Sequence, residues 1–484
     1  GWINDPNGPF FYKGVCHLFY QYLPGSAKWD WGLMWGHAVS FDLVHWTHLP
    51  PALVPTPGGA DQDGVFSGCA AIDEETGIPV LLYTGVRLRS SETCGPRPPP
   101  ECDLNLPFIE SQLFAFPADL DDPLLEHWIK DDVPLLTLPP PSMNLGGWRD
   151  PYIIATPSTS CDGQYVMLLG SGVKNRGGIT LVYKSQHLTR GWRYHGALAS
   201  SDNMAWGIVW ECPLLAELHP HGAPLPPLES DAFPAPPAGP LRPGRLYRRQ
   251  LAGHHAVRSI EARQPKLPGG TAPAIASAAA GAHANGSCGA AVGVDEPPRY
   301  YFFCQSPDAP ANPTFYWIGS FCHKSIRYDV DNAHGPYQLD YGDILYAPNV
   351  LIDQSGRTLL VAWLQERRTV GTYTYAGCIG LPRVLSIDES GPEPRLVQSP
   401  LPEAAALRRR GKSWVHGIGV SDGADGVGGG AAMTRGDDVG RSVCSSREAA
   451  ALCGADTALG CVNEKMLLRH PDRGARTPKR TSLD

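Results

Sequence analysis

Three acidic residues share one local pattern, in which a tryptophan comes shortly before the acid and a proline shortly after it. A residue that precedes proline is driven toward extended backbone, and a neighbouring indole offers a large apolar face. Carboxylates in this setting are expected to be fixed and partly desolvated, which suits acid/base and nucleophilic catalysis. A lone Asp-Pro is a common turn starter, as at Asp122-Pro123, so the hypothesis depends on the recurrence. The three segments are Trp2-Ile-Asn-Asp5-Pro6, Trp148-Arg149-Asp150-Pro151 and Trp210-Glu211-Cys212-Pro213.

The chemistry that these acids suit is glycoside hydrolysis. A retaining glycosidase uses two carboxyl groups about 5 to 5.5 Å apart, one as nucleophile and the other as acid and then base. Asp5 lies in a tight Asn-Asp-Pro-Asn-Gly turn that leaves its side chain little freedom. Arg149 precedes Asp150 and is expected to hold that carboxylate ionised, as suits a group that binds sugar hydroxyls. Glu211 has no cation beside it in the sequence and is the expected proton donor.

The composition favours a neutral small molecule as partner. Of the 484 residues 42% are hydrophobic and only 18% charged, and the formal net charge is -8. No basic surface for nucleic acid or an anionic membrane is expected, and no apolar run reaches the length of a membrane span. The 13 cysteines lack the paired short spacings of a zinc site, so neither a metal nor a cofactor is expected. Cys94 and Cys102 flank a Pro-rich loop and are a candidate disulfide.

Short segments rich in aromatic and branched residues alternate with Gly, Pro, Asn and Asp turns, which predicts an all-β protein, either a propeller or a sandwich. Residues 216–298 are dominated by Ala, Pro and Gly and are expected to form a disordered insertion, and residues 391–484 a low-complexity tail. The sequence starts inside the first motif without a signal peptide, so we expect the natural N-terminus to lie upstream. The predicted strands fall within residues 9–22, 33–40, 79–84, 112–116, 152–155, 165–169, 179–183, 300–304, 315–319, 358–363 and 378–387.

The three acid-containing segments closely resemble the signature motifs of glycoside hydrolase family 32, the invertases and fructan hydrolases. Other segments resemble further motifs of the family and follow in the family's order, so the resemblance covers about residues 1–388 apart from the insertion. These segments are Phe19-Tyr-Gln-Tyr22, Trp35-Gly-His-Ala-Val-Ser40, Asp63-Gly-Val-Phe-Ser-Gly68, Asp122-Pro-Leu-Leu125, Asp340-Tyr-Gly-Asp343 with Tyr346-Ala347, and Gly380-Leu-Pro-Arg383.

This resemblance implies a five-bladed β-propeller over residues 1–390, with the family's C-terminal β-sandwich missing or degenerate in residues 391–484. It implies that Asp5 is the nucleophile, Glu211 the acid/base and Asp150 the transition-state stabiliser of an extracellular or vacuolar β-fructofuranosidase without a metal or cofactor. His37 and His45 are expected to be structural. The residues that match positions of the family's fructose pocket are Asn4, Gln21, Trp29, Phe66, Ser67 and Arg149.

We therefore expect a retaining enzyme that releases terminal fructose from sucrose or short fructans. A fructan exohydrolase or a fructosyltransferase on the same scaffold, and a non-catalytic propeller that binds sugars, stay open as alternatives. The family often carries an acid beside the glucose subsite in the stretch before Tyr316, where this chain has Asp308 nearby but no direct counterpart. The choice between sucrose and fructan is therefore open, as is the oligomeric state.

Overall fold

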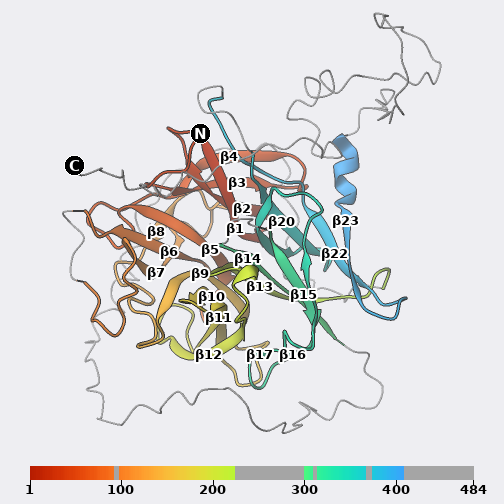
Figure 1. The fold of residues 1–484 in the computed structure, drawn as a ribbon. Helices are drawn as coiled ribbons and strands as arrows, with labels where there is room; N and C mark the ends of the chain where they lie inside the picture. Colours follow the sequence, from red (N-terminus) through yellow and green to blue (C-terminus); the bar gives the residue numbers. More distant parts are fainter. Residues whose placement is uncertain (92–96, 224–298, 309–312, 367–372, 408–484) are drawn as a thin grey trace, which may run out of the picture.

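The computed structural model describes residues 1–91, 97–223, 299–308, 313–366 and 373–407, which form antiparallel β-strands and two short 3-10 helices (Figure 1). The all-β prediction is confirmed. The strands fall into five groups that follow one another along the chain, and Figure 1 shows these groups arranged around a common centre. Most of the expected insertion, from residue 224 to 298, and the tail from residue 408 onward lie outside the described residues.

The first two groups are four-stranded sheets whose strands pair in chain order. The run predicted at residues 9–22 is the end of one strand and the start of the next, because the chain turns at Lys13 and Gly14, which both have positive φ (48° and 79°). The first group contains β1 (Trp2–Tyr12), β2 (Val15–Leu23), β3 (Met34–Ser40) and β4 (Trp46–Leu53), and the second contains β5 (Gly64–Ile72), β6 (Pro79–Leu88), β7 (Phe108–Pro117) and β8 (Trp128–Lys130).

The third and fourth groups are joined into one eight-stranded sheet by the pairing of Ser171 with Trp210. Residues 216–218, expected to belong to the insertion, complete β13 and pair with β14. The third group contains β9 (Leu145–Ala155), β10 (Tyr165–Val173), β11 (Gly177–Ser185) and β12 (Arg193–Ser200). The fourth, which follows the helix η1 (Met204–Trp206), contains β13 (Trp210–Leu218), β14 (Tyr300–Pro307), β15 (Phe315–Gly319) and β18 (His334–Gln338), with a small hairpin of β16 (Phe321–Cys322) and β17 (Arg327–Tyr328).

The fifth group extends beyond residue 390, where we expected the propeller to end. Its last strand, β23, pairs with β22 from Arg383–Pro400 to Asp388–Arg395, and the helix η3 follows it. The tail that we expected from residue 391 therefore begins with ordinary sheet structure. The group contains β19 (Leu345–Ile352), β20 (Thr358–Leu364), β21 (Cys378–Ile379), β22 (Arg383–Asp388) and β23 (Arg395–Pro400), and η3 covers Pro402–Leu407.

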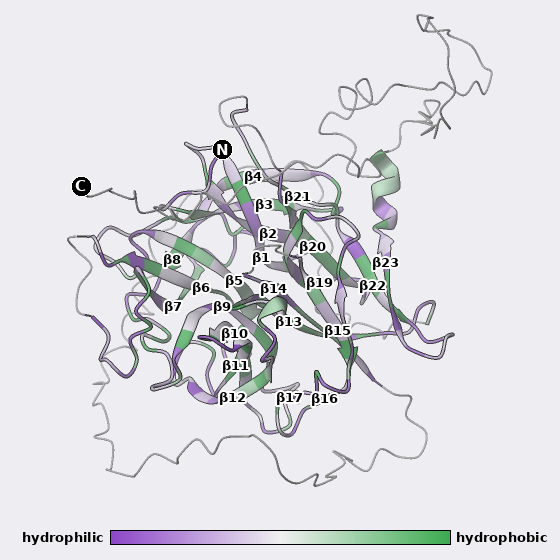
Figure 2. Ribbon diagram, viewed as in Figure 1, coloured by the Kyte–Doolittle hydropathy of each residue, from purple (hydrophilic) through white to green (hydrophobic). Residues whose placement is uncertain are grey.

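Apolar side chains pack between each pair of neighbouring groups and close the five groups into a ring. Trp148 and Tyr165 of the third group pack with Leu82 of the second, and Cys16 of the first packs with Leu351 of the fifth. Each group therefore packs against a neighbouring group on either face. Figure 2 shows apolar stretches on strands such as β13, β20 and β22. The strands that lie side by side at the centre are β1, β5, β9, β13 and β19.

The ring is also closed by backbone hydrogen bonds between the first strand and residues near β21. The amide of Ile3 donates to the carbonyl of Ala376 at 2.9 Å, and the amide of Ala376 donates to the carbonyl of Gly1 at 3.0 Å. These bonds form a parallel bridge between Trp2 and Ala376. The strand that carries Asp5 is thus tied to a segment more than 350 residues later in the sequence.

Cys102, one of the two cysteines of the candidate disulfide, is a free cysteine with a buried side chain. Cys94 lies outside the described residues. In the described part of the chain no helix has the length and apolar character needed to cross a membrane.

Candidate active site

Each of the five central strands departs from regular pairing with a neighbouring strand at least once, and β1 and β9 do so at more than one place. A bulge of this kind leaves a residue unpaired and turns its side chain in a new direction. Asp5 and Asp150 lie within such irregularities, and Glu211, which pairs with Ser306, borders one. The irregularities that concern the site fall between Asn4 and Pro6 in β1, Val65 and Gly68 in β5, Arg149 and Tyr152 in β9, Glu211 and Leu214 in β13, and Tyr346 and Asn349 in β19.

At three of these bulges the residue before a proline has left-handed backbone, and not the extended backbone that we had expected. Asp150 has φ of 65° and Cys212 has φ of 48°, and Ala347 of the fifth group, also before a proline, has φ of 45°. Left-handed backbone is costly for such residues and persists only where surrounding contacts enforce it. At Asp150 the amide donates to Thr84 Oγ1 at 2.9 Å, and the carboxylate accepts from the Cys212 amide at 2.9 Å.

Asp5 and Asp150, from the first and third groups, meet at the thiol of Cys212. The Cys212 Sγ lies 3.9 Å from Asp5 Oδ2 and 3.8 Å from Asp150 Oδ2. Ser67 Oγ donates to Asp5 Oδ2 at 2.6 Å, so this predicted pocket residue contacts the predicted nucleophile directly. The sequence had therefore identified a set of side chains that the fold brings together.

Burial sets the ionisation of both aspartates. It raises the pKa of Asp5 to about 6, against the opposing hydrogen bond from Ser67. It also raises the pKa of Asp150 to about 7, where the cation of Arg149 opposes it and the charge of Glu211 adds to it. The expectation that Arg149 would hold Asp150 ionised is therefore wrong, because desolvation outweighs the neighbouring cation.

Arg149 binds Glu211, which the sequence had left without a cation. Its Nε and Nη2 donate to Glu211 Oε1 at 3.0 and 2.7 Å, and its Nη1 donates to Glu110 Oε1 at 3.0 Å. Asp150 lies at a bulge with left-handed backbone, where the regular alternation of side chains does not apply, and the guanidinium of Arg149 extends to Glu110 and Glu211. The cation next to Asp150 in the sequence is thus the partner of Glu211 in space.

The second carboxylate oxygen of Glu211 is held by Tyr346. The tyrosine hydroxyl donates to Glu211 Oε2 at 2.6 Å and also lies 3.1 Å from the carbonyl oxygen of Pro307. Burial and the charge of Glu211 raise the pKa of Tyr346 well above its usual value, so the hydroxyl keeps its proton. Sequence analysis missed Tyr346, Glu110 and Thr84 as site residues, although the segment Tyr346-Ala347 resembles a motif of the family.

The remaining predicted pocket residues lie around this centre. Asn4 donates to Gln21 Oε1 and accepts from the Trp2 indole at 2.7 Å, and both Asn4 and Gln21 are buried. Trp29 and Phe66 are partly buried and meet edge to face with ring centroids 6.4 Å apart, against the apolar cluster that contains Cys212. Trp31, which sequence analysis missed, stacks on Phe66 at 6.1 Å and an interplanar angle of 9°.

The two histidines that we expected to be structural have partners outside the site. Buried His37 lies 3.0 Å from His17 and stacks on Phe19, and exposed His45 bonds to Asp42. Asp308 lies 3.9 Å from Arg149 Nη2 and is 40% exposed, which places it at the edge of the acidic cluster. Among the described residues, no group of three or more His, Cys, Asp and Glu side chains is arranged to hold a metal ion.

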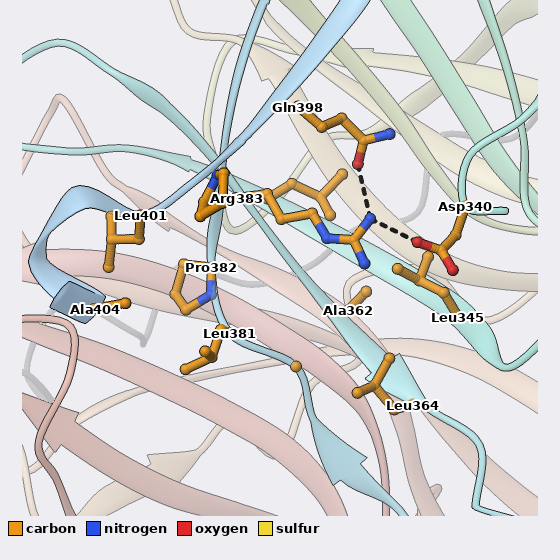
Figure 3. A pocket seen from close by; sticks show the side chains of 13 residues that line it. Asp340, Leu345, Ala362, Leu364, Leu381, Pro382, Arg383, Gln398, Leu401 and Ala404 are labelled. Atoms are coloured by element: carbon orange, nitrogen blue, oxygen red, sulfur yellow. Dashed lines mark hydrogen bonds and ion pairs between the residues drawn. The ribbon is translucent and has the colours of Figure 1, made fainter. Parts of the chain in front are cut away.

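A cavity of about 270 Å³ lies in the fifth group, away from the three acids. Figure 3 shows Arg383 reaching across it to Asp340 and Gln398, and Arg383 Nη1 lies 2.8 Å from Asp340 Oδ1. Apolar residues such as Leu345 and Leu401 form the rest of its lining. This cavity is therefore distinct from the candidate active site.

The chain matches the model of the glycosyl hydrolases family 32 N-terminal domain over residues 1–231 and 293–400, and it belongs to this family. It is 30% identical over 417 residues to the β-fructofuranosidase insoluble isoenzyme 3 of Oryza sativa subsp. indica, covering 84% of this chain and 56% of that protein. It is 38% identical over 211 residues to β-fructofuranosidase 1 of Zea mays, covering 44% of this chain and 28% of that protein. The chain thus spans little more than half the length of the rice relative.

Two solved structures are similar in fold. Fructan 1-exohydrolase IIa from Cichorium intybus has a TM-score of 0.58 and 26% sequence identity, and the match covers 84% of this chain and 60% of that one. A Bombyx mori family 32 β-fructofuranosidase, solved as a mutant with sucrose, has a TM-score of 0.54 at 23% identity, covering 84% and 65%.

The raised pKa of Asp5 leads to a prediction about pH. In the nucleophile role predicted from the sequence, Asp5 must be ionised to act, so kcat/KM for a β-fructofuranoside is expected to fall as the pH decreases through about 6. In Ser67→Ala the ionised form loses a hydrogen bond, and this acidic limb should move to higher pH. Ser40→Ala, which removes a hydroxyl bonded to Asp42, is the control and should leave the limb in place. A limb near pH 4 in the wild type would show that burial does not govern the nucleophile.

Proposed function

We propose that this protein hydrolyses the bond between a terminal β-D-fructofuranosyl unit and its leaving group, with net retention of configuration. The observation that supports this most directly is the convergence of three carboxyl groups from three parts of the ring. Asp5 and Asp150 both contact Cys212, and Glu211 is its neighbour in the chain. We also propose that the five strand groups are the blades of a five-bladed propeller, as the family relationship indicates.

In the proposed first step, an oxygen of Asp5 attacks the anomeric carbon and Glu211 donates a proton to the departing oxygen. Asp150 binds the fructose hydroxyls. In the second step Glu211 takes a proton from water, which displaces Asp5. Burial supports the role of Asp5, since a desolvated carboxylate gains more from forming a covalent bond than a hydrated one.

Tyr346 suits the change of Glu211 between acid and base. Its single hydroxyl proton has two acceptors within reach, Glu211 Oε2 at 2.6 Å and the carbonyl of Pro307 at 3.1 Å. When Glu211 is ionised, the hydroxyl stabilises it. When Glu211 is protonated, the hydroxyl can turn to Pro307, so that neither state leaves a buried polar group without a partner.

Sucrose and short fructans are the proposed substrates. A relative in complex with sucrose and another in complex with 1-kestose support this range, without deciding between the two substrates. The described residues around Asp5 supply the fructose side of such a site through Asn4, Gln21 and Ser67. Fructan exohydrolysis and fructosyl transfer use the same first step, so they remain alternatives to hydrolysis of sucrose. A non-catalytic sugar-binding role has less support, because all three acids are intact.

The configuration of the first-formed fructose tests this mechanism. Two inversions at the same carbon give net retention, so proton NMR recorded during the first turnovers should show the β-anomer from both sucrose and 1-kestose. The control is fructose of known anomeric composition added under the same conditions, which gives the rate of mutarotation. Initial release of the α-anomer would exclude a covalent intermediate on Asp5, and accumulation of a longer oligosaccharide would show transfer.

A further inference from the structure

One buried acid beside the site has no part in the proposed mechanism. Glu110, on β7 of the second group, is 4% exposed and binds the chain just before Asp150 with both carboxylate oxygens. Its Oε2 accepts from the backbone amide of Trp148 at 2.7 Å, and its Oε1 accepts from Arg149 Nη1 at 3.0 Å. The carboxylate therefore fixes both the strand and the side chain that precede the predicted stabiliser.

The geometry of Arg149 transmits this contact to Glu211. A guanidinium group is planar and presents its N–H donors in a rigid fork, so the position of Nη1 sets the direction of the other edge. That edge, formed by Nε and Nη2, is the one that binds Glu211 Oε1. A side chain at Gly147 would exclude this arrangement, because a Cβ there would lie 2.3 Å from Arg149 Nη1.

The negative charge of Glu110 also affects Glu211 through Arg149. One guanidinium cation lies between two carboxylates, so Glu110 offsets part of the positive charge that Glu211 experiences. Without that offset, the full positive charge of the guanidinium would act beside Glu211 and repel the proton that Glu211 must hold for the leaving oxygen. The other titratable or charged groups of the cluster, which stay unchanged in the test below, are Asp5 on β1, Arg149 and Asp150 on β9, Cys212 on β13, Asp308 after β14 and Tyr346 on β19.

We infer that Glu110 is a positioning residue: it orients Arg149 toward Glu211, and its negative charge offsets part of the charge of the guanidinium that lies between the two carboxylates. This inference rests on the proposed function, since Glu110 acts on Glu211 of the same site through Arg149. A purely structural ion pair between two sheets would change only the stability of the protein.

The variant Glu110→Gln removes the charge and keeps the size of the side chain, but its amide can accept from only one of the two donors that Glu110 binds, the Trp148 amide and Arg149 Nη1. The alkaline limb of the kcat/KM profile should move to lower pH by roughly one unit. Asp61→Asn is the matched control, since Asp61 is also buried and pairs with a cation, Lys130, but bonds Tyr83 and not the site. The control should leave the limb in place. An alkaline limb at the same pH in Glu110→Gln and in the wild type would overturn the role of the charge.

The variant Glu110→Asp tests the position separately. It keeps the charge but shortens the reach by one methylene, so kcat should fall roughly tenfold while the alkaline limb stays near its wild-type pH. An unchanged kcat would overturn the positioning role, and this result can be read even if the glutamine variant fails to fold.

An infrared titration without substrate separates this inference from the proposed function. The carboxyl band that disappears in Glu211→Gln reports the proton on Glu211, and in Glu110→Gln it should be lost at lower pH than in the wild type. A wild-type protein that releases no fructose would refute the proposed function, while the shift of this band would still support the coupling. An unshifted band would refute the coupling whatever the activity.

Discussion

Replacement of Asp5 by alanine is expected to lower kcat for sucrose and 1-kestose by roughly four to six orders of magnitude, because the covalent route disappears with its nucleophile. The fold should be retained. At neutral pH the folded protein must keep a buried carboxylate ionised, although its pKa is raised to about 6, whereas the unfolded chain ionises it near the usual 3.8. This group therefore lowers stability as the pH rises from about 4 to 6, and removing it relieves that cost above pH 6.

The control for this variant is Asp122→Ala, which removes the aspartate of the Asp122-Pro123 turn. Asp122 accepts from the backbone amides of Leu124 and Glu126 and stabilises a turn. Its loss should lower the melting temperature and leave kcat near the wild-type value. Near wild-type turnover in Asp5→Ala at saturating substrate would show that another group is the nucleophile.

A second large effect is expected for Glu211→Gln, in which glutamine cannot donate the proton that the leaving oxygen needs. The loss in kcat for sucrose should be roughly 10²- to 10⁴-fold, the usual contribution of general acid catalysis. A nitrophenyl β-fructofuranoside, whose leaving group departs without a proton, should lose much less in the first step. Azide, which needs no general base, should then restore turnover and yield a fructosyl azide.

Glu217→Gln is the matched control, since Glu217 lies on the same strand but accepts from Tyr301 on the outer part of the fourth group. It should not change the dependence on the leaving group. Equal losses for sucrose and the nitrophenyl substrate in Glu211→Gln would mean that Glu211 serves only to bind substrate.

The sequence identified the acids because their motifs are contiguous, but it could not identify contacts made between strands. Arg149 and Asp150 are neighbours in the chain, yet the guanidinium of Arg149 forms its hydrogen bonds with Glu110 and Glu211. Glu110 binds Arg149 from another sheet, 39 positions away in sequence. A lone acid in a strand-like segment gives no local signal of such a partner.

The strands that sequence analysis missed have physical explanations as well. β4 contains Pro50 and Pro51, which read as a loop, but it is an outer strand of its sheet, where proline is tolerated. β13 contains Pro213, which sits at the bulge and not within the regular ladder. The left-handed backbone of Asp150 could not be predicted either. A residue before proline usually has extended backbone, whereas the backbone of Asp150 is set by a bulge that contacts with neighbouring strands enforce.

The bridge between Trp2 and Ala376 has a consequence for biosynthesis. The strand that carries Asp5 leaves the ribosome well before its partner Ala376 and before the β19 residue Tyr346, which holds Glu211. A nascent chain that ends at residue 300 carries all three acids and still lacks the groups that fix two of them. Closing contacts of such long sequence separation form late in folding. Under the proposed function, catalytic activity therefore reports that the ring has closed, and a folding assay based on fructose release would follow the last step of assembly and not the formation of individual sheets.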